Sequence, residues 1–185
     1  AAVAQHAGFE RLITFDMGGT STDVAWHEGT PERTWEAQVD GLRLRVPMLE
    51  IDTIAAGGGS ICRFDGQRLR VGPGSAGAVP GPACYRAGGP ATVTDCHVVL
   101  GRLDPDLLPS VFGADRRQSI DPAASRRAFE RIAAGMSAAT GTSMSIEAIA
   151  EGCLRIAVAR MAGAVRKISV EQGRSLEDVT LVAFG

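Results

Sequence analysis

The feature that most constrains the fold is an acidic, glycine-rich stretch between two apolar runs, at residues 12–25. One apolar run leads into Asp16; two glycines and three hydroxyl residues follow, and Asp23 precedes a second apolar run. Because strands read as apolar runs bounded by turn residues, this pattern predicts a strand, a tight turn and a second strand. Gly18 and Gly19 can take backbone angles that are closed to other residues, and they leave no side chain in the way.

The composition of this turn is typical of a site that holds a nucleotide phosphate. Successive backbone N–H groups in such a turn form a concave surface that binds anions, and hydroxyl groups add further donors. Asp16 and Asp23 can hold a hydrated Mg²⁺, which prefers oxygen ligands. A hairpin turn without a ligand is the alternative, since the same residue types favour turns. The candidate phosphate-binding residues are Gly18, Gly19, Thr20, Ser21 and Thr22.

Composition narrows the classes of function. The chain has 185 residues, 45% of them hydrophobic, and a formal net charge of −2, which indicates a folded domain. The absence of a basic stripe with interleaved aromatics argues against a nucleic-acid partner. No apolar run is long enough to cross a bilayer, so no membrane is expected. Lys167 is the only lysine, and it follows Arg166 rather than a glycine. The phosphate-binding loop of the pattern Gly-x-x-x-x-Gly-Lys is therefore excluded.

The four cysteines are scattered, without Cys-x-x-Cys spacing. This usage favours a reduced cytoplasmic protein with thiols in its core. Cys84, Cys96 and His97 could be imagined as metal ligands, but no fourth ligand and no zinc-type spacing accompany them. The sequence leaves open whether any of these three residues binds a metal.

Further short strands follow the first two, which are predicted at Arg11–Phe15 and Asp23–His27. Residues Thr34–Val39 are a third candidate, and the alternation from Leu42 to Val46 before a proline suits a short edge strand. Successive strands joined by tight turns predict an antiparallel meander. A hairpin is expected around residues 65–67, where a glycine turn separates two apolar segments.

Two glycine-rich segments are candidates for ligand contact. The first contains Gly57, Gly58, Gly59 and Ser60, where close approach of a ligand and a mobile loop are equally good explanations. The second, Gly72–Pro90, matches Gly-x-Gly-x-x-Gly but is followed by prolines that cannot open the helix of a dinucleotide site. We expect it to be a long, packed and functional loop.

The second half of the chain reads as helices followed by a strand. A helix is predicted within 92–103, with Thr94 or Asp95 at its start; Asp95 either caps the helix or faces the glycine–proline loop in a functional role. Asp121 and Pro122 begin the next helix, and Ser145 caps another. Residues 179–184 read as a buried strand. Strands, then helices, then a strand suit an α/β (α+β) fold with a mixed sheet covered by helices.

Four stretches together resemble a known family. They are Ile13–Val24, Ile54–Ile61, Val71–Tyr85, and Thr92–Asp95 with Leu100–Leu103. The chain is similar to hydantoinase/5-oxoprolinase A-type (HyuA-like) proteins of the actin-like ATPase superfamily, which have a ribonuclease H-like fold. Where these proteins usually continue the Thr-Asp segment with Ala-Asn, this chain has Cys96-His97.

The resemblance implies a two-lobed ATPase that uses ATP and Mg²⁺, with the whole chain, residues 1–185, an internal fragment of the second lobe of the catalytic domain. It implies catalytic roles for Asp16, Asp23 and Asp95, with the first two also at the metal, and cleft-lining positions for the glycines at 57–59 and Ser60. Gly185 would begin the adenosine loop. A B-type partner subunit is also implied.

The implied reaction is ATP-dependent hydrolysis of a cyclic amide of the hydantoin, N-methylhydantoin or 5-oxoproline type, through phosphorylation of the amide oxygen. Two alternatives stay open: a subunit of an ATP-dependent ketone carboxylase, and a non-enzymatic actin-like nucleotide-binding module. The isolated fragment is predicted to be inactive, because it would hold about half of a nucleotide site.

Overall fold

The computed structural model describes residues 1–39 and 41–185, which form two compact units. The first comprises residues 1–17, 22–54 and 161–185, and the second comprises 18–21 and 55–160. Each unit has its own hydrophobic core. The prediction of one fragment of a second ATPase lobe therefore corresponds to two units, and their assignment to that lobe stays a prediction.

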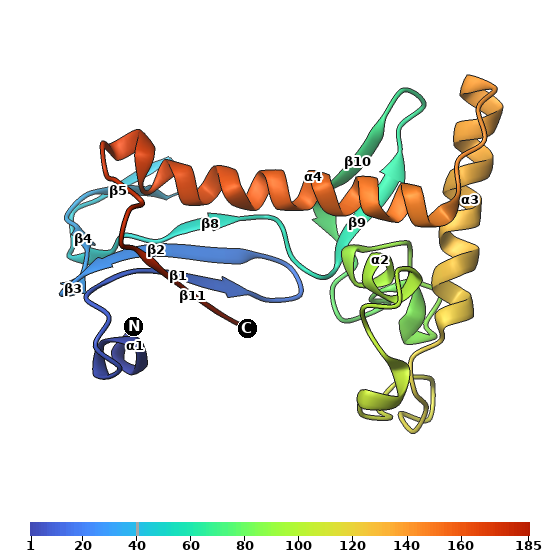
Figure 1. Cartoon of the computed structure of the whole chain (residues 1–185), viewed down its shortest axis with the longest axis horizontal. Coiled ribbons are helices and arrows are strands. Elements are labelled where there is room, and N and C mark those ends of the chain that lie inside the picture. The colour runs from blue at the N-terminus through green and yellow to red at the C-terminus, as the bar shows by residue number, and fades with distance from the viewer. Residues whose placement is uncertain (40) are drawn as a thin grey trace. The chain divides into compact units, whose positions relative to one another are not determined.

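A mixed sheet forms the centre of the first unit (Figure 1). Its strands are β11 (Thr180–Phe184), β1 (Arg11–Met17), β2 (Thr22–Glu28) and β3 (Thr30–Pro31), in that order, with β8 (Asp52–Ile54) also paired to β2. The β1–β2, β2–β3 and β2–β8 pairs are antiparallel, whereas β11 runs parallel to β1. The predicted strands around the acidic turn and the mixed sheet are confirmed.

The core of the first unit packs against this sheet because the inward residues of β1 and β2 are apolar. Ile13, Val24 and Trp26 are buried with Ala164 and Ile168, which follow Arg160 in the chain and so belong to the same unit. Such burial stabilises each large side chain by about 1.5–3 kcal/mol. Hydrophobic packing against one face thus stabilises the sheet that carries Asp16 and Asp23.

The strand predicted at residues 34–39 is divided into two short strands in the structure. In place of a single strand at 34–39, the structure has β4 (Arg33–Thr34), paired with β7 (Met48–Leu49), and β5 (Ala37–Val39), paired with β6 (Leu42–Leu44). The break has a local cause: the Thr34 hydroxyl donates to the Glu36 carbonyl at 2.9 Å, and such side-chain turns compete with strand pairing. The first unit also contains α1 (Ala2–His6), residues 161–167 of α4 (Ile146–Lys167) and a 3-10 turn at Val170–Gln172.

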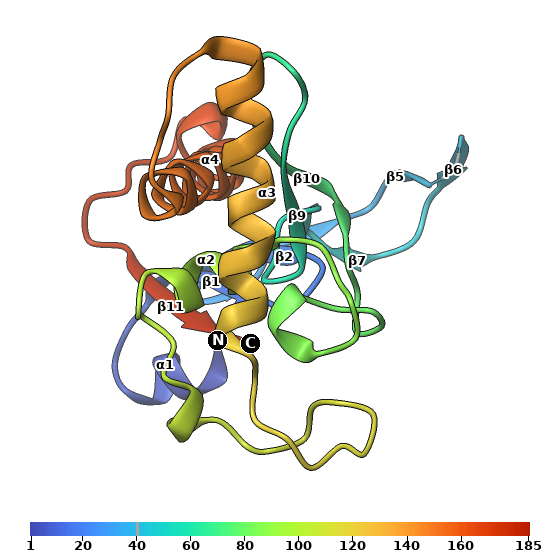
Figure 2. The same ribbon diagram turned by 90° about the vertical axis from the view of Figure 1, so that its right-hand side faces the viewer.

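The second unit combines a hairpin with helices (Figure 2). The hairpin, β9 (Ser60–Phe64) and β10 (Leu69–Ser75), confirms the turn expected at 65–67. The helices are α2 (Val93–Val99), α3 (Pro122–Thr140) and the part of α4 (Ile146–Lys167) up to residue 160, with 3-10 turns at Ala83–Tyr85 and Pro105–Leu107. Helix α3 contacts α2 and β9.

Two boundaries differ from the expectation. The segment 72–90 is not one long loop, since residues 72–75 continue β10 and 83–85 form a 3-10 turn. Helix α2 is capped by Thr92, not by Thr94 or Asp95. The predicted starts of α3 and α4 are confirmed: the Asp121 carboxylate accepts from the Ala123 N–H, and the Ser145 hydroxyl from the Ala148 N–H. Among the described residues, no helix has the length and apolarity to cross a bilayer.

Candidate functional site

In the first unit, the acidic residues of the predicted turn lie opposite one another. Asp16, near the end of β1, is the antiparallel partner of Asp23, near the start of β2. Directly opposed residues present their side chains on the same face, and like charges in that position destabilise a sheet by a fraction of a kcal/mol. The Thr53 hydroxyl donates to the Asp23 carboxylate at 2.6 Å. Both carboxylates are half-buried, so they remain open to a ligand on one side.

Gly185 lies beside this acidic pair. It follows β11, whose last residue is the parallel partner of Asp16. A Cβ atom at position 185 would lie 2.8 Å from Asp16 Oδ1 and closer still to the Met17 carbonyl. The ends of two parallel strands thus meet at one edge of the sheet, which is where α/β proteins commonly bind ligands.

In the second unit, residues 18–21 form the tip of the turn. The Gly18 N–H donates to the Ser21 carbonyl at 3.0 Å, and Gly18, Gly19 and Thr20 are exposed. Neither glycine has a positive φ, so the turn does not use the backbone angles that only glycine adopts freely. A Cβ atom would meet nothing within 4 Å at Gly19, and only the Ser21 carbonyl at 3.8 Å at Gly18. The fold of the described residues therefore does not require glycine at either position.

The segment 57–60 supports this turn. The Gly58 N–H donates to the Gly18 carbonyl at 3.1 Å, and the Gly59 N–H to the Gly19 carbonyl at 2.6 Å. A Cβ atom on Gly57 would lie 2.6 Å from the Gly18 carbonyl oxygen. The glycines are thus needed for a close approach of the chain's own backbone, which neither of the two explanations, a ligand or a mobile loop, included.

This use of the backbone changes the expected role of the segment. The Gly57 N–H donates to the Ser60 hydroxyl at 2.9 Å, and the Ser60 N–H to the Gly57 carbonyl at 3.1 Å. All four N–H groups from Gly57 to Ser60 therefore have partners inside the protein. We revise their role from binding a cofactor directly to holding the turn at 18–21 in place.

Three other residues complete this support. Thr94 holds the Gly58 carbonyl through its N–H at 2.8 Å and its hydroxyl at 3.0 Å. The Ala76 N–H donates to the Gly59 carbonyl at 2.8 Å, and the Ser75 hydroxyl to Thr20 Oγ1 at 3.4 Å. Sequence reasoning missed Ser75 and Thr94, as it missed Thr53 beside Asp23. Their proximity to the two glycine segments offered a signal, but only the fold shows which carbonyl each one faces.

Thr22 does not share the exposure of the turn. It is fully buried in the first unit, where it lies opposite Met17 and Ile54 in the sheet. The prediction that its hydroxyl contacts a phosphate does not agree with this burial. The phosphate-binding candidates therefore reduce to residues 18–21.

Asp95 is fully buried and committed to internal hydrogen bonds. Its Oδ2 accepts from the N–H of Ala83 and from the N–H and hydroxyl of Thr92; its Oδ1 accepts from the N–H of Cys84 and the hydroxyl of Ser125, all at 2.7–3.0 Å. It also closes the capping box of α2. These contacts do not support the expected place near a substrate; they give Asp95 the role of joining α2, α3 and the segment at 83–84.

The cysteines group differently from the spacing considered in the sequence. All four are free and buried. Cys96 lies with Cys62 and Cys153, and over the described ranges neither Cys84 nor His97 belongs to a group of potential metal ligands. Burial lowers the pKa of His97 and raises that of the Cys84 thiol.

The chain has a mixed α/β fold, and the solved structures that it matches show that this fold is a fragment of the actin-like ATPase type. The chain matches acetone carboxylase in its nucleotide-free structure, with a TM-score of 0.82 and 27% identity, over 100% of this chain and 25% of that one. It matches the ATP-dependent caprolactamase from Pseudomonas jessenii with a TM-score of 0.78 and 37% identity, over 100% of this chain and 26% of that one.

The chain belongs to the hydantoinase/oxoprolinase family, whose model matches residues 1–185. It is 43% identical over 180 residues to 5-oxoprolinase 1 of Arabidopsis thaliana, which is 94% of this chain and 14% of that protein. It is 38% identical over 188 residues to the caprolactamase subunit alpha of Pseudomonas jessenii, which is 99% of this chain and 25% of the relative. The chain thus spans between a seventh and a quarter of the length of these relatives.

Proposed function

We propose that the chain is one segment of an A-type subunit that hydrolyses a cyclic amide at the expense of ATP. The observation that best supports this proposal is the turn at residues 18–21, of which Gly18, Gly19 and Thr20 are exposed. The described fold leaves space for a side chain at Gly18 and Gly19, so it does not itself require glycine there. The carbonyl groups of both residues accept hydrogen bonds from the segment 57–59. Glycine at such positions is explained by a ligand that approaches the backbone closely.

The residues take distinct roles in this reaction. The N–H groups of Gly19, Thr20 and Ser21 and the hydroxyls of Thr20 and Ser21 bind phosphate oxygens; Gly19 and Thr20 are exposed and Ser21 is half-buried. Asp16 and Asp23 would hold Mg²⁺, and the bound cation would relieve the repulsion between the two opposed carboxylates. Phosphoryl transfer depends mainly on positioning and charge neutralisation. A supported glycine turn suits the first requirement, and a pair of opposed carboxylates that hold a cation suits the second. Phosphorylation of the amide oxygen turns a poor electrophile into one that water can attack.

The substrate class is supported by the relatives. The names 5-oxoprolinase and caprolactamase both denote enzymes that open a cyclic amide, and they share 43% and 38% identity with this chain. We therefore propose a lactam or imide of the 5-oxoproline or hydantoin type. ATP-dependent ketone carboxylation is the second candidate, favoured by the TM-score of 0.82 with acetone carboxylase.

The setting of the protein is proposed on similar grounds. The caprolactamase relative is described as a subunit alpha, which supports a B-type partner subunit for this protein. Four free cysteines support a reducing, cytoplasmic location.

Turnover by the full-length protein tests the proposal. ATP hydrolysis and ring opening are measured with 5-oxoproline, hydantoin, N-methylhydantoin, caprolactam, acetone and acetophenone, the ketones with bicarbonate. We expect ATP turnover to rise with one or more cyclic amides. Stimulation only by ketones would support the carboxylase, and ATP hydrolysis that ignores all of them would support an actin-like switch.

A variant places the chemistry at the acidic pair. Asp16→Ala is expected to abolish turnover with little change in the thermal midpoint, because Asp16 is half-buried at a strand end. The equivalent change at exposed Asp106, outside the site, serves as the control. Retained activity in Asp16→Ala would show that the assigned role is wrong.

A further inference from the structure

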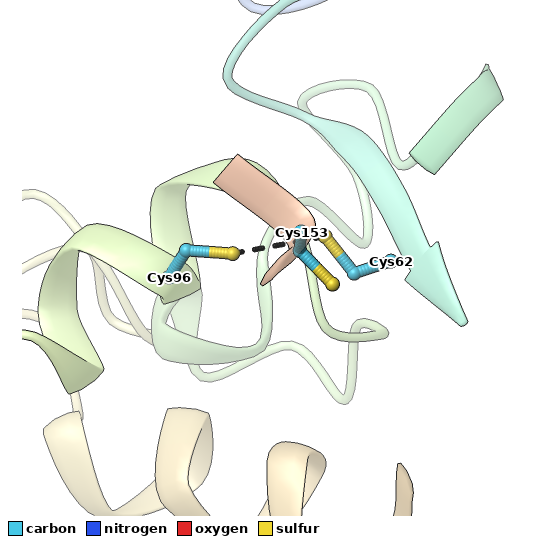
Figure 3. A group of neighbouring side chains, drawn as sticks. All are labelled: Cys62, Cys96 and Cys153. Carbon is cyan, nitrogen blue, oxygen red and sulfur yellow. Dashed lines mark hydrogen bonds between the residues drawn. The ribbon is translucent and has the colours of Figure 1, made fainter. Parts of the chain in front are cut away.

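Three buried cysteines come together inside the second unit from three different elements. Cys62 lies on β9, Cys96 on α2 and Cys153 on α4. Their Sγ atoms all lie within 4.8 Å of one another, and those of Cys62 and Cys96 are 3.8 Å apart. Figure 3 shows the side chains approaching one another from the strand and the two helices. We call these residues the thiol cluster.

The spacing of the thiol cluster suits a metal ion bound by sulfur. A metal–thiolate bond is about 2.3 Å long, so two thiolates on one ion lie about 3.8 Å apart in tetrahedral geometry and about 4.0 Å apart in trigonal geometry. The Cys62–Cys96 separation already has this value. The remaining separations, which are within 4.8 Å, need a contraction of less than about 1 Å.

The chemistry of the donors selects the class of ion. Among the described residues, the group contains sulfur ligands only, with no histidine or carboxylate. Thiolates prefer soft ions such as Zn²⁺ and Cu⁺ over Mg²⁺ or Ca²⁺, which take oxygen ligands. The thiol cluster is therefore distinct in kind from the acidic pair at Asp16 and Asp23.

A pocket borders the thiol cluster at Cys62. Its volume is about 310 Å³, and Cys62 lines it together with Phe64, Ala91, Ala128 and Ile132. The pocket lies wholly within the second unit.

We propose that Cys62, Cys96 and Cys153 form a three-thiolate site for a soft d¹⁰ metal ion of the Zn²⁺ or Cu⁺ class. The ion ties β9, α2 and α4 together. It also braces the turn at 18–21, because Ser60 lies two residues before Cys62 and Thr94 two residues before Cys96, and both belong to the support of that turn.

Metal titration of the reduced full-length protein tests this site. Co²⁺ serves as the spectroscopic probe for Zn²⁺, and Cu⁺ is supplied under anaerobic conditions against a chelator. We expect one equivalent to bind per chain, with a thiolate-to-cobalt charge-transfer band that Zn²⁺ or Cu⁺ abolishes. A band that is retained when excess Zn²⁺ is added but is lost when Cu⁺ is added would identify the Cu⁺ class. Absence of stoichiometric binding in both arms would overturn the proposal.

Matched variants locate the site. Cys153→Ser is expected to weaken binding by at least about 10-fold, whereas Cys84→Ser, which changes a buried cysteine outside the cluster, is expected to leave it unchanged. Equal losses in both variants would contradict the assignment.

X-ray absorption of the wild-type protein covers the case in which a variant fails to fold. It is expected to show three sulfur ligands at about 2.3 Å from the metal. Fewer than three sulfur ligands would overturn the proposal.

Discussion

Replacing Gly57 by alanine tests the close approach of two backbone segments. The new Cβ atom would lie 2.6 Å from the Gly18 carbonyl oxygen and 2.8 Å from the Gly19 carbonyl carbon. Both are backbone atoms, so no flexible side chain can move aside. Either the strain is retained, at about 1–3 kcal/mol, or the hydrogen bonds from Gly58 and Gly59 are lost, at about 1 kcal/mol each. We expect a local loss of about 2–3 kcal/mol.

Hydrogen exchange in the full-length protein measures this loss where it occurs. A cost of 2–3 kcal/mol corresponds to about 30- to 160-fold faster exchange of the Gly58 and Gly59 amides. Gly19→Ala is the matched control on the facing segment, since its Cβ would meet nothing within 4 Å; its stability is expected to stay within about 1 kcal/mol of the wild type. Unchanged exchange in Gly57→Ala would refute the idea that the segment needs glycine for this contact.

Three further predictions concern stability and activity. Asp95→Asn removes an acceptor from at least one buried N–H group and is expected to lower the free energy of unfolding by about 2–4 kcal/mol. Loss of turnover at an unchanged thermal midpoint would instead indicate a catalytic role. Burial lowers the pKa of His27, so as the pH drops the unfolded state binds a proton at His27 before the folded state does, and the free energy of unfolding should fall below about pH 6.5. His27→Gln should reduce the dependence of this free energy on pH in that range, and an unchanged dependence would contradict the prediction. The 185-residue chain alone is expected to hydrolyse no ATP, and Mg²⁺-dependent turnover by the purified chain would disprove that.

The local elements could be predicted from the sequence because their signals are local. Apolar runs on either side of Asp16 and Asp23 gave β1 and β2, and a proline after Asp121 gave the start of α3. The break after Thr34 was missed because a side-chain hydrogen bond, rather than composition, ends that strand.

The site was predicted less completely, since its contacts join distant segments. Three glycines at 57–59 indicated a close approach but not its partner, which lies some 40 residues earlier. Asp95 follows the glycine–proline loop, which suggested a functional role. Only its five hydrogen bonds to four residues of the chain indicate a structural role. The thiol cluster has no spacing signature, because its three members come from a strand and two helices far apart in the chain.

Nucleotide affinity of Gly19→Ala in the full-length protein tests the central claim most directly. The added methyl group would meet nothing within 4 Å among the described residues, so we expect its main effect to fall on a ligand that approaches the turn there. Calorimetric titration with ATP and Mg²⁺ is compared with Gly135→Ala, whose Cβ also meets nothing within 4 Å. Losing a hydrogen bond to a charged phosphate costs about 1.5–3 kcal/mol, which is roughly 10- to 150-fold in affinity. We predict that loss for Gly19→Ala alone, and equal affinity in both variants would contradict phosphate binding at this turn.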